Sequence, residues 1–146
     1  MLQRTEVTAA LADFLRQMPQ VNALWEGGAA SFSRVDEWSD IDLLADADDN
    51  TGEEVMKRVT EMLDSKFGIE LKYDIVNGWP GLTQTFFRLK NSSPFMLIDL
   101  GIVKNSATDK FLESEIHGSH MVHFDKANVI QPTAINKDAL LNKLQQ

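Results

Sequence analysis

The chain has 146 residues, of which 43% are hydrophobic, and this size is typical of one globular domain with a substantial core. It contains no cysteine, which excludes disulfides, thiolate zinc sites and cysteine nucleophiles. The formal net charge of −8 argues against binding of duplex DNA or RNA, which requires clustered Lys and Arg. No apolar run predicts a membrane span, and the amino terminus lacks the pattern of a signal peptide, so we expect a cytoplasmic protein.

The first part of the chain predicts a helix followed by two strands. Apolar residues recur at helical spacing from Leu11 to Met18 and a proline then stops the pattern, which predicts a helix over about residues 5–18. The segment VNALWE, residues 21–26, predicts a short strand, and residues 41–45 predict the next one.

A second helix is expected over about residues 52–67. Thr51 followed by Glu54 has the pattern of a capping box, and the apolar residues after it share one helical face. Gly68 follows at the position of a C-cap, where a glycine commonly ends a helix.

The rest of the chain is rich in predicted strands separated by turns. Strands are expected at 69–76, 82–89, 95–103, 121–124 and 129–130, and a short helix at 136–146. The order of elements predicts an α/β (α+β) domain over residues 1–135, with a mixed, largely antiparallel sheet and helices packed on one side. The helix at 136–146 is too short to be stable alone, so it must pack on this domain, on a partner, or on a helical domain that this chain lacks.

Two carboxylates in an apolar run are the first candidate site residues. In Asp40-Ile41-Asp42-Leu43 the alternation of a strand sends both aspartates to one face, with their Cα atoms about 7 Å apart. Their oxygens can converge on a divalent cation such as Mg²⁺, which removes the repulsion between them. The alternative interpretation is an exposed edge strand with solvated acidic residues.

Asp99 is a third candidate, because it stands in the apolar segment Phe95-Met96-Leu97-Ile98-Asp99-Leu100. An ionised aspartate in the middle of a strand is costly unless it is paired or binds metal. If its strand lies beside that of Asp40 and Asp42, three carboxylates could bind two metal ions. The alternative is a structural aspartate with satisfied hydrogen bonds.

Gly27 and Gly28 follow the first predicted strand, and eleven residues separate them from Asp40. Without side chains, their backbone can approach a phosphate closely and offer N–H groups to it. The alternative interpretation is a tight turn.

The pattern Gly-Gly, eleven residues, Asp-Ile-Asp-Leu and a later apolar-Asp-apolar strand resembles the nucleotidyltransferase superfamily of DNA polymerase β type. More narrowly, it resembles the bacterial nucleotidyltransferases that adenylylate aminoglycoside or lincosamide antibiotics. The segments VDEWSDIDLLAD and HGSHMVHFDKANVI are also similar to stretches in that group. The resemblance covers most of residues 21–131.

This resemblance implies a nucleotidyltransferase-like fold and transfer of AMP from ATP to a hydroxyl of a small molecule, with release of pyrophosphate. It implies that Asp40, Asp42 and Asp99 bind two Mg²⁺ ions, and that Asp99 also serves as base for the acceptor hydroxyl. The residues implied to lie near the phosphates are Gly27, Gly28, Ser31 and Ser39.

The sequence departs from the family in two ways. The family's glycine is usually followed by serine, and here only Ser31 or Ser33 could supply that hydroxyl. The antibiotic enzymes usually carry a carboxy-terminal helical domain, so a minimal version would need a second subunit to build the acceptor site. Two rival hypotheses follow: a catalytically weak nucleotide-binding or antitoxin-like module of the same fold, and an acidic protein–protein interaction domain.

Overall fold

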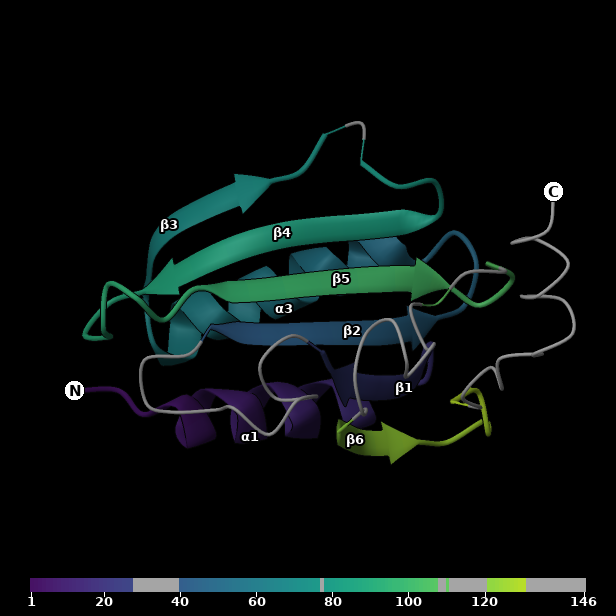
Figure 1. Cartoon of the computed structure of the whole chain (residues 1–146), viewed down its shortest axis with the longest axis horizontal. Coiled ribbons are helices and arrows are strands. Elements are labelled where there is room, and N and C mark those ends of the chain that lie inside the picture. Colours follow the sequence, from purple (N-terminus) through teal and green to yellow (C-terminus); the bar gives the residue numbers. More distant parts are fainter. Residues whose placement is uncertain (28–39, 77, 108–109, 111–120, 131–146) are drawn as a thin grey trace, which may run out of the picture.

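The computed structural model describes residues 1–27, 40–76, 78–107, 110 and 121–130. In this part of the chain it is an α+β structure with two helices and one mixed sheet (Figure 1). The elements in chain order are α1 (Arg4–Arg16), β1 (Val21–Glu26), β2 (Ile41–Ala47), α3 (Gly52–Lys66), β3 (Ile69–Asp74), β4 (Leu82–Leu89), β5 (Ile98–Lys104) and β6 (Met121–Asp125).

The six strands lie in the order β3-β4-β5-β2-β1-β6. Strands β2 and β5 are parallel, and the other neighbouring strands are antiparallel. The predicted mixed, largely antiparallel sheet is therefore confirmed. The alternative that placed Asp40 and Asp42 on an edge strand is wrong, because β2 lies between β5 and β1 and is paired on both sides.

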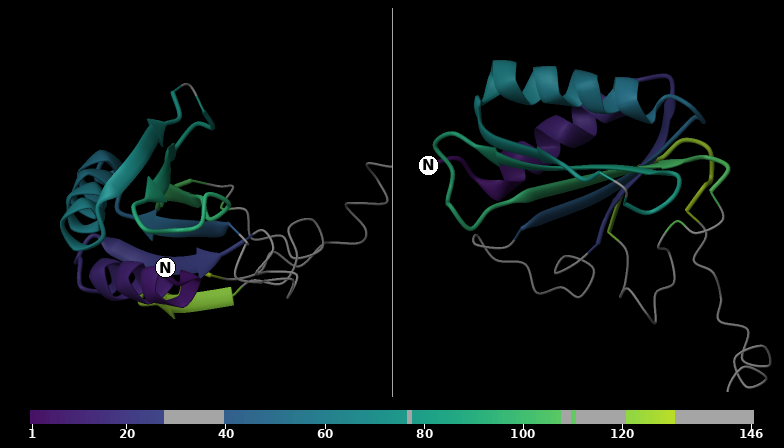
Figure 2. Two further views of the ribbon diagram at one scale, coloured as in Figure 1. Left: turned by 90° about the vertical axis from the view of Figure 1, so that its left-hand side faces the viewer. Right: turned by 90° about the horizontal axis from the view of Figure 1, so that it is seen from above.

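Both helices cover the same face of the sheet, as the two side views show (Figure 2). Helix α1 packs on β1 and β6, and α3 packs on β4 and β5. The core between the layers contains the apolar stripes of both helices and alternate residues of the strands, among them Val7, Leu11, Leu15, Val55, Val59, Leu63, Ile41, Leu43, Ile98 and Leu100. Burial of each large aliphatic side chain contributes about 1.5–3 kcal/mol, so this layer fixes the position of the central strands.

The helices predicted at about 5–18 and 52–67 are confirmed, but the predicted capping box of α3 is wrong. The Thr51 hydroxyl donates to the carbonyl oxygen of Asp48 at 2.6 Å and does not cap the helix. The C-cap prediction is confirmed: Gly68 has φ +81° and its N–H donates to the carbonyl oxygens of Leu63 and Asp64. A left-handed residue at this position satisfies carbonyls that have no partner within the helix.

The strand predictions need three corrections. Strand β3 ends at Asp74, and β5 begins at Ile98 because a turn precedes it, in which the Met96 N–H donates to the Ser93 carbonyl oxygen. The strand predicted at 129–130 is absent, since both backbone N–H groups of this pair donate to the Asp125 carboxylate at 2.8 Å. The helix predicted at 136–146 lies outside the described residues, and in the described part no helix is long and apolar enough to cross a membrane.

Candidate active site

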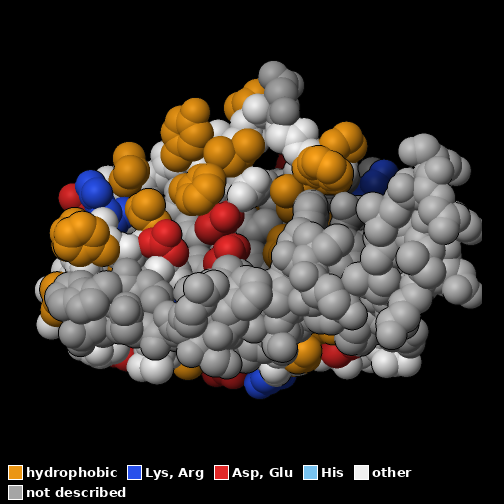
Figure 3. Space-filling view, in the orientation of Figure 1, with side chains coloured by type: hydrophobic (Ala, Val, Ile, Leu, Met, Phe, Trp, Pro, Cys, Tyr) orange, Lys and Arg blue, Asp and Glu red, His pale blue; other side chains and the backbone are white. Residues whose placement is uncertain are grey.

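Asp42 and Asp99 lie side by side on the face of the sheet that the helices leave open. They are register partners on the parallel strands β2 and β5, where neighbouring strands are about 4.8 Å apart. Their sequence neighbours Ile41 and Ile98 are buried under the helices, so strand alternation turns the carboxylates to the opposite face. Acidic side chains gather near the middle of this face, beside hydrophobic ones (Figure 3). The prediction that the strand of Asp99 lies beside that of Asp42 is therefore confirmed.

Burial and neighbouring negative charges raise the cost of ionising both carboxylates. Burial, followed by the charges of Asp99, Asp40 and Glu26, raises the pKa of Asp42 to about 6. Burial and the charge of Asp40 also raise the pKa of Asp99, although a hydrogen bond from Gln84 acts in the opposite direction. A site that holds several negative charges in a partly buried place is one that a cation would stabilise.

Gln84 is a site residue that the sequence did not reveal. It lies on β4, and its Nε2 donates to Oδ1 of Asp99 at 2.8 Å. This bond orients the Asp99 carboxylate, and within the described residues no hydrogen bond reaches its Oδ2. The only signal in the sequence was its place at alternate positions with Arg88 in a predicted strand, which does not tell which strand lies next to it.

Asp40 precedes β2 and is exposed. Its Oδ1 accepts a hydrogen bond from the Leu97 N–H at 3.2 Å, and the Ile41 N–H donates to the Leu97 carbonyl oxygen at 2.8 Å. Asp40 thus ties the beginning of β2 to the beginning of β5. Its charge raises the pKa of both Asp42 and Asp99, which places it in the same electrostatic site.

Gly27 lies next to Asp42 at the end of β1. Its N–H donates to the Asp42 carbonyl oxygen at 2.9 Å, and a Cβ at this position would lie 4.0 Å from Asp42 Oδ2. Gly27 therefore lies beside the carboxylate of Asp42. The other residues predicted to lie near phosphates, Gly28, Ser31 and Ser39, lie outside the described residues.

The carboxylates of Asp42 and Asp99 are suited to supply two ligands of a divalent cation, and not its complete coordination shell. Among the described residues, no three acidic or histidine side chains are close enough to hold one metal ion together. Mg²⁺ is usually held by one or two carboxylates, with phosphate and water oxygens as the other ligands. Asp42 and Asp99 could supply such a pair, and Asp40 could join only by a change in its side chain.

Glu26 is a second residue that the sequence did not reveal. It is 1% exposed, and its Oε1 lies 3.6 Å from Nη2 of Arg4 and 3.3 Å from Nε2 of His123. Burial raises the pKa of Glu26, but the contact with His123 and the charge of Arg4 outweigh it, so this pKa lies below its usual value. A charged Glu26 joins α1, β1 and β6 and adds to the negative field around Asp42.

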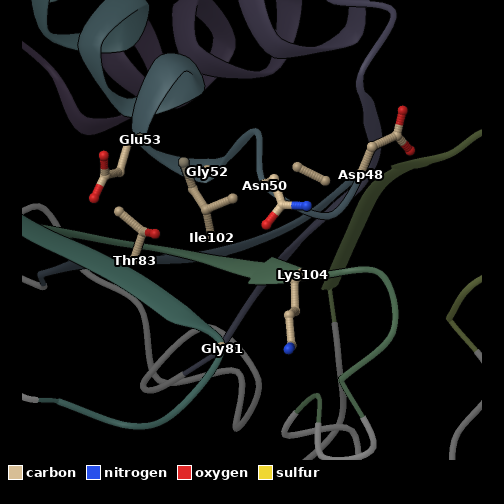
Figure 4. Close-up of a pocket in the computed structure, with 9 residues that line it drawn as sticks. Asp48, Asn50, Gly52, Glu53, Gly81, Thr83, Ile102 and Lys104 are labelled. Atoms are coloured by element: carbon tan, nitrogen blue, oxygen red, sulfur yellow. The ribbon is translucent and has the colours of Figure 1, made fainter.

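A pocket of about 320 Å³ lies at the other end of β2 and β5, where α3 begins (Figure 4). Its lining includes Gly52 and Glu53 from α3, Thr83 from β4 and Lys104 from the end of β5. None of the predicted site residues lines it, so its shape does not bear on the carboxylate pair.

Comparison with models of known protein families finds no match, and comparison with curated proteins finds no significant relative.

Proposed function

We propose that this chain is a nucleotidyltransferase domain that transfers AMP from ATP to a hydroxyl of a small molecule and releases pyrophosphate. The observation that carries the proposal is the pair of partly buried carboxylates, Asp42 and Asp99, on adjacent parallel strands. The position of Gly27 beside Asp42 and the nearby charge of Asp40 support it. We propose a nucleotidyltransferase-like fold on the same grounds, together with the motif pattern of the sequence.

Each of the four polar site residues has its own role in the proposed reaction. Asp42 and Asp99 would hold Mg²⁺ against the triphosphate, and Asp40 would add negative charge beside them. When bound, Mg²⁺ would supply positive charge that neutralises the phosphates and the developing charge on the leaving group. Gln84 donates to Oδ1 of Asp99 and so orients this carboxylate: Oδ1 keeps a second lone pair for the metal ion, and Oδ2 would accept the proton.

The chemical balance of the step is simple. The acceptor oxygen attacks the α-phosphorus, and an oxygen–phosphorus bond forms as the bond from that phosphorus to the bridging oxygen of the β-phosphate breaks. Pyrophosphate leaves with the bond's electron pair, and the acceptor's proton passes to Asp99 Oδ2. We propose an aminoglycoside or lincosamide as the acceptor, which would make the chain an antibiotic-resistance protein.

The first test is calorimetric titration of ATP into the protein with Mg²⁺. We expect binding in the micromolar range that requires Mg²⁺ and is lost in an Asp40→Asn, Asp42→Asn double variant. Asp13→Asn is the matched control, because this exposed residue on α1 lies outside the site. Failure of the wild-type protein to bind millimolar ATP would overturn the proposal.

A second candidate is a nucleotide-binding module without catalysis. It is favoured by the failure of three carboxylates to converge among the described residues. Pyrophosphate release in the presence of a panel of aminoglycosides and lincosamides distinguishes the two. Mg²⁺-dependent ATP binding without release for any acceptor would favour the binding module.

A further inference from the structure

Strand β3 ends the sheet and presents large apolar side chains to solvent. Leu71 is 46% exposed and Tyr73 is 63% exposed. Tyr73 is the register partner of Phe86 on β4, which in turn pairs with Asp99, so Tyr73 lies on the open face of the sheet. An exposed apolar edge strand is a template for pairing with another strand.

The backbone of β3 has its free hydrogen-bonding groups at every second residue. The Ile75 N–H donates to the Gln84 carbonyl oxygen at 3.0 Å, so Ile75 faces β4. Because hydrogen-bonded and non-hydrogen-bonded pairs alternate in an antiparallel ladder, Tyr73 also faces β4, and the N–H and C=O groups of Lys72 and Asp74 point away from it. In the described part of the chain no strand lies beyond them.

The opposite edge is less suited to pairing. Strand β6 is five residues long, and its ladder with β1 is irregular between Leu24 and Trp25. The chain after β6 folds back, and the N–H groups of Val129 and Ile130 donate to Asp125 at the end of that strand. Bulges and short strands are devices that prevent edge pairing, and β3 has no irregularity from Leu71 to Asp74.

We propose that two copies of this chain pair through β3, antiparallel, on a two-fold axis at Tyr73. In this register Lys72 lies opposite the partner's Asp74, and both residues have outward backbone groups that can form the ladder. Lys72 Nζ already lies 3.0 Å from Asp74 Oδ2 within one chain, so both charges are on the same side of the strand. The strand is therefore complementary to itself in charge and in hydrogen bonding.

The nearby registers are worse, and an axis at Asp74 sets the two copies of this carboxylate opposite each other. An axis at Lys72 places the two lysines opposite each other and Glu70 opposite Asp74, which sets like charges together. An axis at Leu71 runs into the irregularity of β3 between Ile69 and Leu71. Only the axis at Tyr73 combines opposite charges with a regular stretch of strand.

Pairing in this way joins the two sheets into one and turns both open faces to the same side. The two Tyr73 side chains meet at the axis, as a non-hydrogen-bonded cross-strand pair. Asp99 then lies on the third strand from the axis, along the row Tyr73, Phe86 and Asp99, and Asp42 lies on the fourth. The inference does not depend on what the carboxylates bind.

Disulfide trapping tests the axis directly, because the chain has no cysteine of its own. Residues at a non-hydrogen-bonded pair have Cα atoms about 4.5 Å apart, which a disulfide can span. Under mild oxidation of dilute protein, we expect Tyr73→Cys to form a covalent dimer, and Leu71→Cys and Val122→Cys to form none. Val122 is the matched control, being 48% exposed on the opposite edge strand. No dimer from Tyr73→Cys, or equal trapping at either control position, would overturn the proposal.

A charge-swap cycle tests the same register without a covalent bond. Lys72→Asp and Asp74→Lys should each weaken the dimer measured by sedimentation equilibrium about tenfold, because each sets like charges opposite one another twice. The double variant Lys72→Asp, Asp74→Lys should restore the wild-type dimer constant within about threefold. Recovery in the double variant also rules out loss of folding as the cause. A wild-type protein that stays monomeric at the highest attainable concentration would contradict the proposal and leave β3 free for a different chain.

Discussion

At the scale of single residues, Asp42 shows how a candidate site costs stability. Its side chain is partly buried beside Asp99, and the pKa of Asp42 is raised to about 6 from 3.8. Between these two pH values the folded state keeps a proton on Asp42 that the unfolded state releases. The stability that protonated Asp42 contributes is therefore fully present below pH 3.8 and is lost as the pH rises through about 6.

Asp42→Asn should make the protein more stable at pH 7.5, by up to about 3 kcal/mol, because the amide removes the cost of ionising a buried carboxylate. The gain should vanish near pH 4, where the native carboxyl is protonated. Urea unfolding of both proteins at the two pH values measures it. The exposed control Asp13→Asn should change neither value by more than about 0.5 kcal/mol. A destabilised Asp42→Asn variant at pH 7.5 would contradict this account of the site.

Gln84 should act as a positioning residue for Asp99. Gln84→Leu removes the donor to Asp99 Oδ1 and should lower kcat about tenfold or more, with a smaller change in the KM for ATP. Gln84→Asn, which keeps an amide on a shorter side chain, should recover part of the loss. Mn²⁺ binding followed by electron paramagnetic resonance gives a readout that does not require turnover. An unchanged kcat and Mn²⁺ affinity in Gln84→Leu would contradict the assignment.

At the scale of elements, β5 depends on a glycine within its length. A Cβ at Gly101 would lie 2.9 Å from Leu44 Cδ2 and 3.0 Å from Leu82 Cδ1, closer than side chains normally approach. Leucines from both neighbouring strands thus cover this position on the open face, two residues after Asp99. A glycine inside a strand often marks such a close approach.

Gly101→Ala should therefore destabilise the protein by about 1–3 kcal/mol, although alanine is normally the better strand residue. Shortening the neighbour in Gly101→Ala, Leu44→Ala should give less destabilisation than the sum of the two single variants, because the second change makes room for the first. Thermal unfolding of the four proteins measures the cycle. Strict additivity would show that the contact with Leu44 is not the cause.

At the scale of the whole molecule, the Glu26 cluster joins elements that are far apart in sequence. Arg4 from α1 and His123 from β6 meet the carboxylate of Glu26 on β1. Arg4 also donates from Nη2 to the Asp40 carbonyl oxygen at 3.4 Å. One arginine therefore links the first helix both to a buried charge and to the chain entering β2.

Arg4→Met should destabilise the protein by about 3 kcal/mol at pH 7.5, because it leaves a buried carboxylate with less compensation. The loss should shrink at low pH, since Glu26 has a lowered pKa and its stabilising charge is lost as the pH falls through that value. Addition of Glu26→Gln should recover part of the stability. Arg58→Met is the control: this arginine forms an exposed i,i+4 pair with Glu54, and its loss should cost less than about 0.5 kcal/mol. Denaturant unfolding of the variants provides the measurement, and equal effects of the two arginine changes would contradict the cluster's role.

Local sequence patterns were sufficient to predict most helices and strands and part of the candidate site. Helix periodicity, the C-cap at Gly68 and the alternation around Asp42 depend on neighbours within a few residues, so they can be read from the sequence. The cap at Thr51 is absent because the residue has helical rather than extended backbone angles, and its hydroxyl is oriented to donate to the Asp48 carbonyl instead of accepting from the helix. The end of β3 and the beginning of β5 were misplaced for a related reason, since pairing partners rather than propensity decide where a strand stops.

By itself the sequence determined that β2 and β5 each have an apolar face and an opposite face, and that Asp42 and Asp99 lie on the faces opposite the apolar ones. Only the tertiary structure decided that Asp42 and Asp99 are partners, that Gln84 contacts Asp99, and that Glu26 meets Arg4 and His123. The physical reason is the distance along the chain over which each interaction acts. Alternation follows from the geometry of one strand, whereas strand order and register follow from how the apolar faces of all the strands are buried together under two helices.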